Sequence, residues 1–248
     1  MGVMNLLETI RQSSNIDPKK IKFYQASTSE QFGAVVETPQ RETTPFNPQS
    51  PYAVSKTAAF QLVRIYRQGY NLFACNGLLF NHESPRRGLN FVTKKVIAAI
   101  AQIALSRKAA PLIVGNLEAK RDWGHARDYV QGMWLILQQK QPRDFVLATG
   151  KQISVRDFIT KCFAAKNIHV EWEGSGFEEI CVEKMQQESK KQKTTLVTVD
   201  KALFRPAEVE SLQGDSSSAR SLLGWQPTTS LDDLIVEMLD EETQSLLS

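Results

Sequence analysis

Residues 21–27 read Ile-Lys-Phe-Tyr-Gln-Ala-Ser, and the chain continues with Thr-Ser-Glu at 28–30. This apolar-rich stretch predicts a buried strand that ends in small hydroxyl residues. Further along, Ser50 and Pro51 are typical of a helix start, because serine caps the free N–H groups and proline loses no needed N–H there. In an open parallel sheet, sites form at the carboxyl ends of the strands, so residues 27–30 are placed where chemistry is expected.

The rest of the chain alternates between helical and extended patterns. Helices are expected at 1–12, 52–68, 91–106, 126–139, 154–165, 216–223 and 230–246, and strands at 21–27, 71–80, 111–115, 144–148 and 168–172. This alternation predicts an α/β fold with a parallel sheet. Residues 183–195, rich in Glu, Gln and Lys, are expected to form a solvated loop.

Composition limits the class of protein. A chain of 248 residues with 42% hydrophobic residues can bury a real core, in one large or two modest domains. The net charge of +3 fits an anionic nucleotide ligand. It does not indicate a nucleic-acid partner, which usually requires a concentrated basic stripe.

Cysteine usage and hydropathy indicate the compartment. Cys75, Cys162 and Cys181 form an odd set without paired spacing, which favours a reducing cytoplasm over a disulfide framework or a zinc site. Cys75 lies in an apolar stretch and is expected to be a small core residue. The longest apolar run, Val96–Leu105, is too short for a membrane span and contains Gln102, and no signal peptide is evident. We therefore expect a cytoplasmic protein without a membrane partner.

Tyr52 and Lys56 form the most informative pair. Residues four apart lie on one helical face, so the phenol and the ammonium can point into one site. A nearby cation favours the phenolate, which can take a proton from a hydroxyl while a nicotinamide takes the hydride. The same spacing is common on ordinary helix surfaces, and the neighbouring strand end with its hydroxyl residues is what favours a catalytic role.

Longer runs extend this pattern and resemble a known family. Five segments closely resemble the GDP-mannose 4,6-dehydratase family of extended short-chain dehydrogenases/reductases: YQASTSE at 24–30, SPYAVSK at 50–56, LFNHESPRRG at 79–88, GNLEAKRDWGHA at 115–126 and FRPAEV at 204–209. The resemblance covers nearly the whole chain. After the glutamate at 30 this chain has Gln31-Phe32-Gly33, where the family pattern has Leu-Tyr-Gly.

The resemblance implies a partial Rossmann fold, in which the first strands of a doubly wound parallel sheet are missing. Residues 1–80 and about 122–150 would be the remainder of the NAD(P)-binding domain. Residues about 81–121 and 151–248 would form an interleaved sugar-nucleotide domain. No Gly-rich dinucleotide fingerprint occurs in the sequence. The family layout implies that roughly a hundred residues that would precede residue 1 are absent. A truncated gene, a split gene or a wrong start would each account for this.

The family reaction is that of a lyase. It converts GDP-D-mannose to GDP-4-dehydro-6-deoxy-D-mannose through a transient NADP-dependent oxidation at C4, elimination across C5–C6 and return of the hydride to C6. By resemblance, Tyr52 takes the O4 proton, and Lys56 tunes Tyr52 and contacts the nicotinamide ribose. Thr28 would hydrogen-bond the developing ketone or the tyrosine oxygen. Glu30 would be the acid/base of the elimination.

The resemblance also implies ligand-binding residues. Besides Lys56, the positions that match cofactor contacts are His82 and Arg87. Those that match substrate contacts are Asn81, Lys94, Lys95, Arg121, Arg205 and Glu208. The two arginines of the second set would clamp the nucleotide diphosphate, because a planar guanidinium suits phosphate oxygens.

Two other classes of function stay open from the sequence. One is a related sugar-nucleotide enzyme, such as another dehydratase or an epimerase; an epimerase needs no carboxylate at Glu30. The other is a non-catalytic fragment that works only with a partner chain. The expected ligands are GDP-mannose and NADP, although the choice of NADP over NAD would lie in the absent segment. Full-length family members form dimers or tetramers, so a homo-oligomer is expected.

Overall fold

The chain forms two compact units in a computed structural model that describes residues 2–14, 17–184, 193–204, 209 and 211–248. Unit 1 comprises Met1–His82, Arg121–Gln152 and Val209–Thr228, and unit 2 comprises Glu83–Lys120, Ile153–Glu208 and Thr229–Ser248. Both units are therefore assembled from segments that are distant in the sequence.

Unit 1 is built on a three-stranded parallel sheet. Its strands are β1 (Lys22–Thr28), β2 (Phe73–Leu79) and β7 (Phe145–Leu147), in the order β1-β2-β7. Thr28 is level with Leu79 in the register, so these two strands end at the same edge of the sheet. The predicted α/β fold with a parallel sheet is confirmed.

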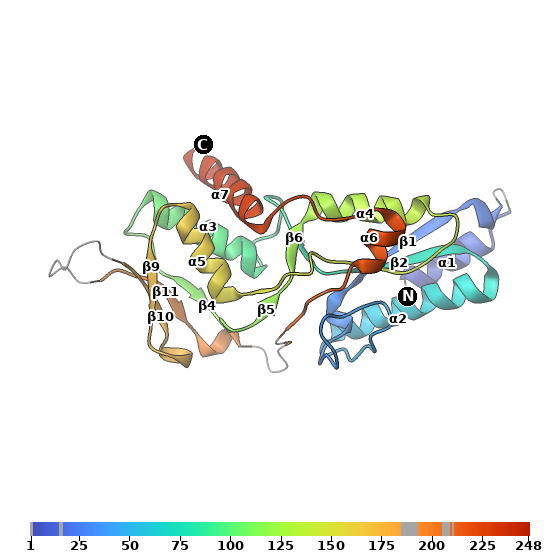
Figure 1. Ribbon diagram of the computed structural model, residues 1–248, viewed down its shortest axis with the longest axis horizontal. Coiled ribbons are helices and arrows are strands. Elements are labelled where there is room, and N and C mark those ends of the chain that lie inside the picture. Colours follow the sequence, from blue (N-terminus) through green and yellow to red (C-terminus); the bar gives the residue numbers. More distant parts are fainter. Residues whose placement is uncertain (1, 15–16, 185–192, 205–208, 210) are drawn as a thin grey trace. The chain divides into compact units, whose positions relative to one another are not determined.

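Helices cover both faces of this sheet (Figure 1). Ala74 packs in one buried cluster with α1 (Gly2–Arg11) and α2 (Pro51–Tyr70), whereas Cys75 packs in another with α4 (Ala126–Gln138). Successive strand residues point to opposite faces, so these helices lie on opposite sides of the sheet. The short strands β3 (Asn81–Glu83) and β6 (Trp123–His125) pair beyond the sheet edge.

The division into compact units differs from the expected domain boundary at one segment. Residues 209–228 were predicted to belong to the second domain, but they belong to unit 1. Leu212, Ala219 and Trp225 are buried in the same core as β2 and β7, and the Trp225 indole donates a 2.7 Å hydrogen bond to the Asp128 carbonyl. The short helix α6 (Ser217–Leu223) lies in this segment. The sequence pattern of this segment indicates a helix, but it does not indicate which of the two cores the helix packs against.

Unit 2 contains a mixed sheet. Its strands are β4 (Leu112–Val114), β9 (Val170–Glu173), β10 (Ile180–Glu183) and β11 (Thr195–Val199), in the order β4-β11-β10-β9. Only β4 and β11 are parallel, and β10 runs antiparallel to both neighbours. The ends of the expected loop at 183–195 therefore lie in strands; its residues 185–192 lie outside the described residues.

The helices of unit 2 are α3 (Val92–Leu105), α5 (Val155–Ala165) and α7 (Leu231–Leu247). Helix α7 packs against both α3 and α5. The two-residue strands β5 (Lys120–Arg121) and β8 (Ile153–Ser154) pair with each other, and Ser154 then caps α5. Four short 3-10 turns complete the described elements: η1 (Pro18–Lys20), η2 (Ser29–Gln31), η3 (Gly176–Glu178) and η4 (Lys201–Leu203).

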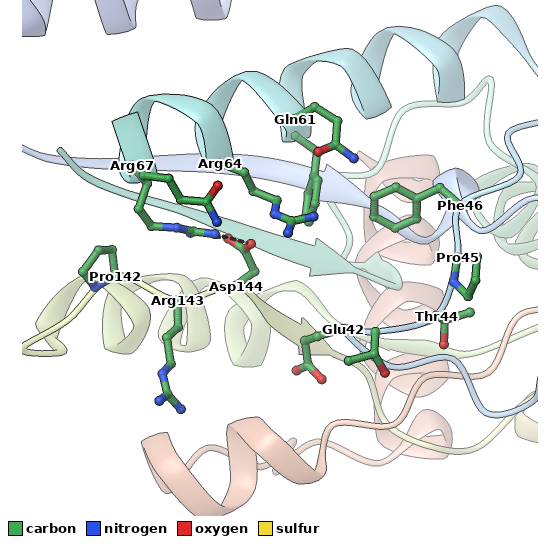
Figure 2. A pocket seen from close by; sticks show the side chains of 13 residues that line it. Glu42, Thr44, Pro45, Phe46, Gln61, Arg64, Arg67, Pro142, Arg143 and Asp144 are labelled. Carbon is green, nitrogen blue, oxygen red and sulfur yellow. Dashed lines mark hydrogen bonds and ion pairs between the residues drawn. The ribbon is translucent and has the colours of Figure 1, made fainter. Parts of the chain in front are cut away.

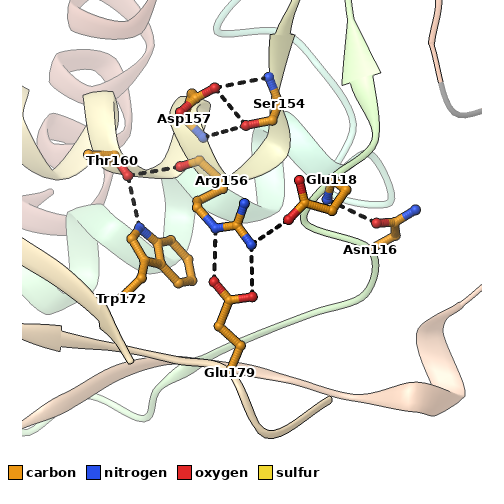
Figure 3. Close-up of polar contacts among 8 residues, drawn as sticks. All are labelled: Asn116, Glu118, Ser154, Arg156, Asp157, Thr160, Trp172 and Glu179. Atoms are coloured by element: carbon orange, nitrogen blue, oxygen red, sulfur yellow. Dashed lines mark hydrogen bonds and ion pairs between the residues drawn. The ribbon is translucent and has the colours of Figure 1, made fainter. Parts of the chain in front are cut away.

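Arg156 organises a polar cluster at the start of α5 (Figure 3). Its guanidinium donates to both carboxylate oxygens of Glu179 at 2.9 and 2.8 Å and lies 2.6 Å from Glu118. It also lies over the Trp172 ring, 5.6 Å from the centroid. Two carboxylates therefore share one guanidinium, which joins α5, β9, the residue before β10 and the loop before β5.

The three cysteine side chains are buried and free. Cys75 packs in the core cluster of unit 1, as expected, and burial raises the pKa of its thiol to about 11. In the described part of the chain, no helix combines the length and apolar character that a membrane crossing requires.

Candidate active site

The carboxyl end of β1 carries Thr28 and Glu30. Thr28 is buried and caps the turn η2: its hydroxyl accepts from the Glu30 N–H at 3.3 Å, and its own N–H donates to Gln31 Oε1 at 3.0 Å. Glu30 is half-buried on the same turn. This reciprocal cap holds the two residues at the strand end, where the sequence predicted them.

The turn is anchored to the loop before α2. Gly33 has φ +54°, and a Cβ there would lie 1.8 Å from the Asn47 carbonyl oxygen, so only glycine fits. Asn47 donates its N–H to Gln31 and accepts from Ala34 at 3.0 and 3.1 Å. Phe32, one of the departures from the family pattern, is fully buried and contacts the rings of Phe46 and Phe80.

Tyr52 and Lys56 lie in the first turns of α2. The Ser50 hydroxyl accepts from the Ala53 N–H at 3.1 Å, and Pro51 occupies the first turn, as predicted. Lys56 Nζ donates to the Ala26 carbonyl at 2.9 Å and lies 5.9 Å from the Tyr52 ring centroid. Burial lowers the pKa of Lys56. The side chain of Lys56 thus joins the helix to the strand that ends in Thr28, while Tyr52 remains 54% exposed.

Asn81 and His82 follow β2 in the same unit. His82 Nδ1 lies 2.8 Å from the Phe80 carbonyl, so a neutral ring donates there and carries its lone pair on Nε2. The ring stacks on Tyr129 with centroids 4.8 Å apart. Asn81 Oδ1 and Ser27 Oγ are buried and make no hydrogen bond with any described residue. A buried polar atom without a partner costs about 1–3 kcal/mol, so these atoms suit a polar ligand.

Arg87 lies in unit 2, in the loop before α3. Its Nε is 2.9 Å from Glu83 Oε2, and its guanidinium carbon is 3.4 Å from the centroid of the Phe91 ring. Glu83 also accepts a 2.8 Å hydrogen bond from the Thr93 hydroxyl. Burial raises the pKa of Glu83 to about 7, although the Arg87 charge acts in the opposite direction. Glu83 was not predicted as a site residue from the sequence, although it lies between His82 and Arg87 in the specific run at 79–88.

The two adjacent lysines of α3 differ in their surroundings. Lys94 is buried, donates to the Pro85 carbonyl at 3.1 Å and pairs with Glu242 at 2.5 Å. Lys95 is exposed, and its ammonium contacts no described residue through a hydrogen bond or ion pair. Arg121 is half-buried at the end of β5. Arg205 and Glu208 lie outside the described residues.

A separate cavity of about 560 Å³ lies in unit 1 (Figure 2). It is lined by the carboxyl-terminal half of α2, residues 42–46 and residues 142–144. Arg67 forms a bidentate pair with Asp144 at 2.7 and 2.6 Å, and Asp144 also accepts the Asn76 N–H at 2.8 Å. None of the predicted catalytic residues lines this cavity, and its paired charges join α2 to the sheet.

Comparison with known proteins gives a consistent family. The family model of GDP-mannose 4,6 dehydratase matches residues 1–238. The chain is 50% identical to GDP-mannose 4,6-dehydratase of Yersinia enterocolitica, covering 98% of this chain and 66% of that protein. It is 49% identical to the Vibrio cholerae enzyme, covering 100% of this chain and 67% of that protein. It is 46% identical to the human enzyme, covering 98% of this chain and 63% of that protein. The chain therefore spans about two thirds of the relatives' length.

Solved structures of lower identity share the fold. The structure of RMD from Pseudomonas aeruginosa complexed with NADPH matches with a TM-score of 0.78 at 19% identity, over 98% of this chain and 72% of that chain. The dTDP-glucose 4,6-dehydratase of Bacillus anthracis in complex with NAD matches with a TM-score of 0.74 at 17% identity, over 98% and 67%.

Proposed function

The chain belongs to the GDP-mannose 4,6-dehydratase family, and we propose that it serves the dehydration of GDP-D-mannose to GDP-4-dehydro-6-deoxy-D-mannose. Because the chain spans about two thirds of its relatives, the complete reaction is proposed for this chain together with the segment that the relatives carry in addition. The product class is a 4-keto-6-deoxy sugar nucleotide, and the enzyme class is a lyase.

The observation that carries the proposal is the hydrogen bond from Lys56 to the Ala26 carbonyl. It places the amino-terminal turns of α2 beside the strand end that bears Thr28 and Glu30. A phenol, an ammonium, a hydroxyl and a carboxylate are thereby gathered in one unit. These are the groups that a C4 oxidation followed by a C5–C6 elimination requires.

Each group has a distinct role in this proposal. Tyr52 acts as the phenolate, which the Lys56 charge favours, and becomes a neutral phenol when it accepts the proton of the 4-hydroxyl. The buried Thr28 hydroxyl donates to the developing C4 carbonyl oxygen. Glu30 removes the C5 proton, which the 4-ketone has acidified, and protonates the departing 6-hydroxyl. The acid/base work is thus divided between α2 and η2, each acting on a different carbon of the sugar.

The bound nicotinamide cofactor, for which we propose NADP, would take the hydride from C4 and return it to C6. Lys56, His82 and Arg87 would contact it. The residues present fit such a group: Asn81 Oδ1 and Ser27 Oγ are buried without a described partner near the strand ends, and Arg87 keeps N–H groups available. Gly-rich turns that bind pyrophosphate through helix N–H groups are not encoded in these 248 residues.

The substrate contacts follow from the same family positions. Asn81, Lys95 and Arg121 would bind the GDP moiety, as would Arg205 and Glu208, which lie outside the described residues. Lys94 is engaged by Glu242, and we therefore assign the direct contact to Lys95. We propose a homo-oligomer, a dimer or tetramer, as the working state.

The test uses a chimera in which residues 1–248 follow the part of the Yersinia relative that lies outside the match. When it is incubated with GDP-mannose and NADP⁺, the chimera should form GDP-4-dehydro-6-deoxy-mannose. Mass spectrometry detects this product because it is lighter than GDP-mannose by one water, about 18 Da. The matched control is the same chimera with Tyr52→Phe. An unchanged mass with GDP-mannose, or conversion of another sugar nucleotide instead, would contradict the proposal.

A further inference from the structure

Glu83 is a carboxylate in an unusual position. It is the first residue of unit 2, its side chain is only 2% exposed, and it contacts groups on two different segments. Thr93, on the first turn of α3, donates to Oε2 at 2.8 Å, and the same oxygen lies 2.9 Å from Arg87 Nε. A buried charge is costly unless it is paired and hydrogen-bonded, so this residue depends on both contacts.

Arg87 is held along one edge and on one face. Glu83 lies at its Nε edge, and the Phe91 ring lies against the guanidinium, with the central carbon 3.4 Å from the ring centroid. The Nε–H is not aligned on the carboxylate oxygen, so the contact with Glu83 is an ion pair and not a hydrogen bond. The two terminal nitrogens make no hydrogen bond with any residue that the structure describes, and 26% of the side chain is exposed.

The Arg156 cluster shows what a purely structural arginine looks like in the same unit. Its guanidinium is shared by Glu179 and Glu118, and both its Nε and a terminal nitrogen donate to carboxylates. At Arg87, one carboxylate lies at the Nε edge of the guanidinium. It immobilises the guanidinium and leaves the two terminal nitrogens without a hydrogen bond to any described residue. A planar fork of this kind binds phosphate or carboxylate oxygens in a bidentate manner.

We propose that Glu83 is a positioning residue whose buried carboxylate orients Arg87 so that its outer N–H groups bind the phosphate oxygens of the nicotinamide dinucleotide. This inference rests on the proposed function, in which Arg87 contacts the cofactor. Glu83 itself does not touch the ligand. Through Thr93, it also fixes the loop 84–91 to the start of α3, so the arginine is held relative to a rigid element.

The deciding experiment observes Arg87 itself in the 248-residue chain. Arginine labelled with ¹⁵N gives a side-chain Nε–H signal whose solvent exchange reports immobilisation. In the parent chain, the Arg87 signal should be sharp and slow to exchange. In Glu83→Gln, which keeps the size but loses the charge, exchange should become about tenfold faster, because the ion pair that holds the buried Nε–H away from water is lost.

The matched control is Glu179→Gln, which removes a buried carboxylate of the same unit from its arginine. It should free the Arg156 signal and leave that of Arg87 unchanged. Glu83→Asp shortens the side chain by one methylene and should give an intermediate exchange rate of the Arg87 signal. This variant replaces Glu83→Gln in the test if Glu83→Gln does not fold. An Arg87 signal that exchanges equally fast in the parent and both Glu83 variants would overturn the inference.

Titration of the chimera with NADPH separates this inference from the proposed function, because the chimera also contains the segment that the relatives carry in addition; the parent in this titration is the chimera with Glu83 in place. NADPH should shift the Arg87 signal of the parent, and Glu83→Gln should require about tenfold more NADPH for the same shift. If NADPH leaves the Arg87 signal of the parent in place while Glu83→Gln frees the side chain, the cofactor role of Arg87 is wrong and the assigned ligand must be withdrawn. Equal NADPH dependence in the parent and Glu83→Gln would contradict the positioning role.

Discussion

The end of β1 in unit 1 and the Arg156 cluster in unit 2 differ in how fully other protein groups bind their polar side chains. At the strand end, Lys56 contacts a backbone carbonyl, and Tyr52 is more than half exposed. In the cluster, Arg156 is surrounded by Glu118, Glu179 and Trp172, which leaves little of its donor capacity unused. Groups that are saturated by the protein stabilise the fold, whereas groups with remaining capacity can serve a ligand.

The largest expected effect concerns the strand end. In the chimera, Tyr52→Phe should lower turnover of GDP-mannose by about 10²–10⁴-fold, because general acid/base groups contribute in that range. No enzyme-bound NADPH should form, since the O4 proton has no acceptor. Absorbance of bound NADPH in a single turnover measures this step.

Glu30→Gln should lower turnover by a similar factor but at a different stage. Oxidation at C4 does not involve Glu30, so bound NADPH should accumulate with a 4-keto sugar that still carries its 6-hydroxyl. Equal loss of NADPH formation in both variants, or intact dehydration in Glu30→Gln, would refute the proposed division between α2 and η2.

The next effect is a pH dependence that comes from Glu83. Its folded-state pKa of about 7 lies above the ordinary value of 4.5, so the folded chain binds this proton more tightly than the unfolded chain. The associated stability is fully present below about pH 4.5 and is lost as the pH rises through 7, by up to about 3 kcal/mol. Chemical denaturation at pH 5 and pH 8 measures the difference, and Glu83→Gln should reduce it. An unchanged difference in the variant would assign the pH dependence to other groups.

A smaller effect is expected from the saturated cluster. Arg156→Met leaves Glu179, which is 8% exposed, without its cation, and should destabilise the chain by about 2 kcal/mol. The contribution of Glu118 is discounted because its side chain is 68% exposed. Thermal unfolding measures the loss. The comparison predicts that the NADPH-dependent shift of Arg87 stays as in the parent chain; a large change there would mean that the cluster also serves the ligand.

The smallest effect compares two neighbouring lysines. Lys95→Ala should raise the KM for GDP-mannose in the chimera by about tenfold with little change in kcat, since one charged contact to a phosphate is worth about 1.4 kcal/mol. Lys94→Met breaks the pair with Glu242 and should lower thermal stability instead. The reverse pattern would assign the substrate contact to Lys94.

The regular elements around the strand end were well predicted from the sequence, and the catalytic roles of the residues there stay predictions. The cap at Ser50 and Pro51, the strand that ends at Thr28 and the helical face shared by Tyr52 and Lys56 all depend on neighbours within a few residues. The strands β10 and β11 were not expected, because β11 begins at the end of a polar run and each strand is stabilised by its partner across the sheet. Their own residues show no clear alternation.

The sequence by itself determined the family and the α/β class, because specific runs and local periodicity encode them, and it placed the predicted catalytic residues at the end of β1 and the start of α2. Only the tertiary structure decided which cation each carboxylate meets. Lys94 pairs with Glu242, Arg156 with Glu179 and Glu83 with Arg87. Two of these pairs join segments that are distant in the chain, and even the local one depends on the burial of Glu83 beneath its loop. Such pairing follows from how the segments pack, and packing cannot be read from the order of the residues alone.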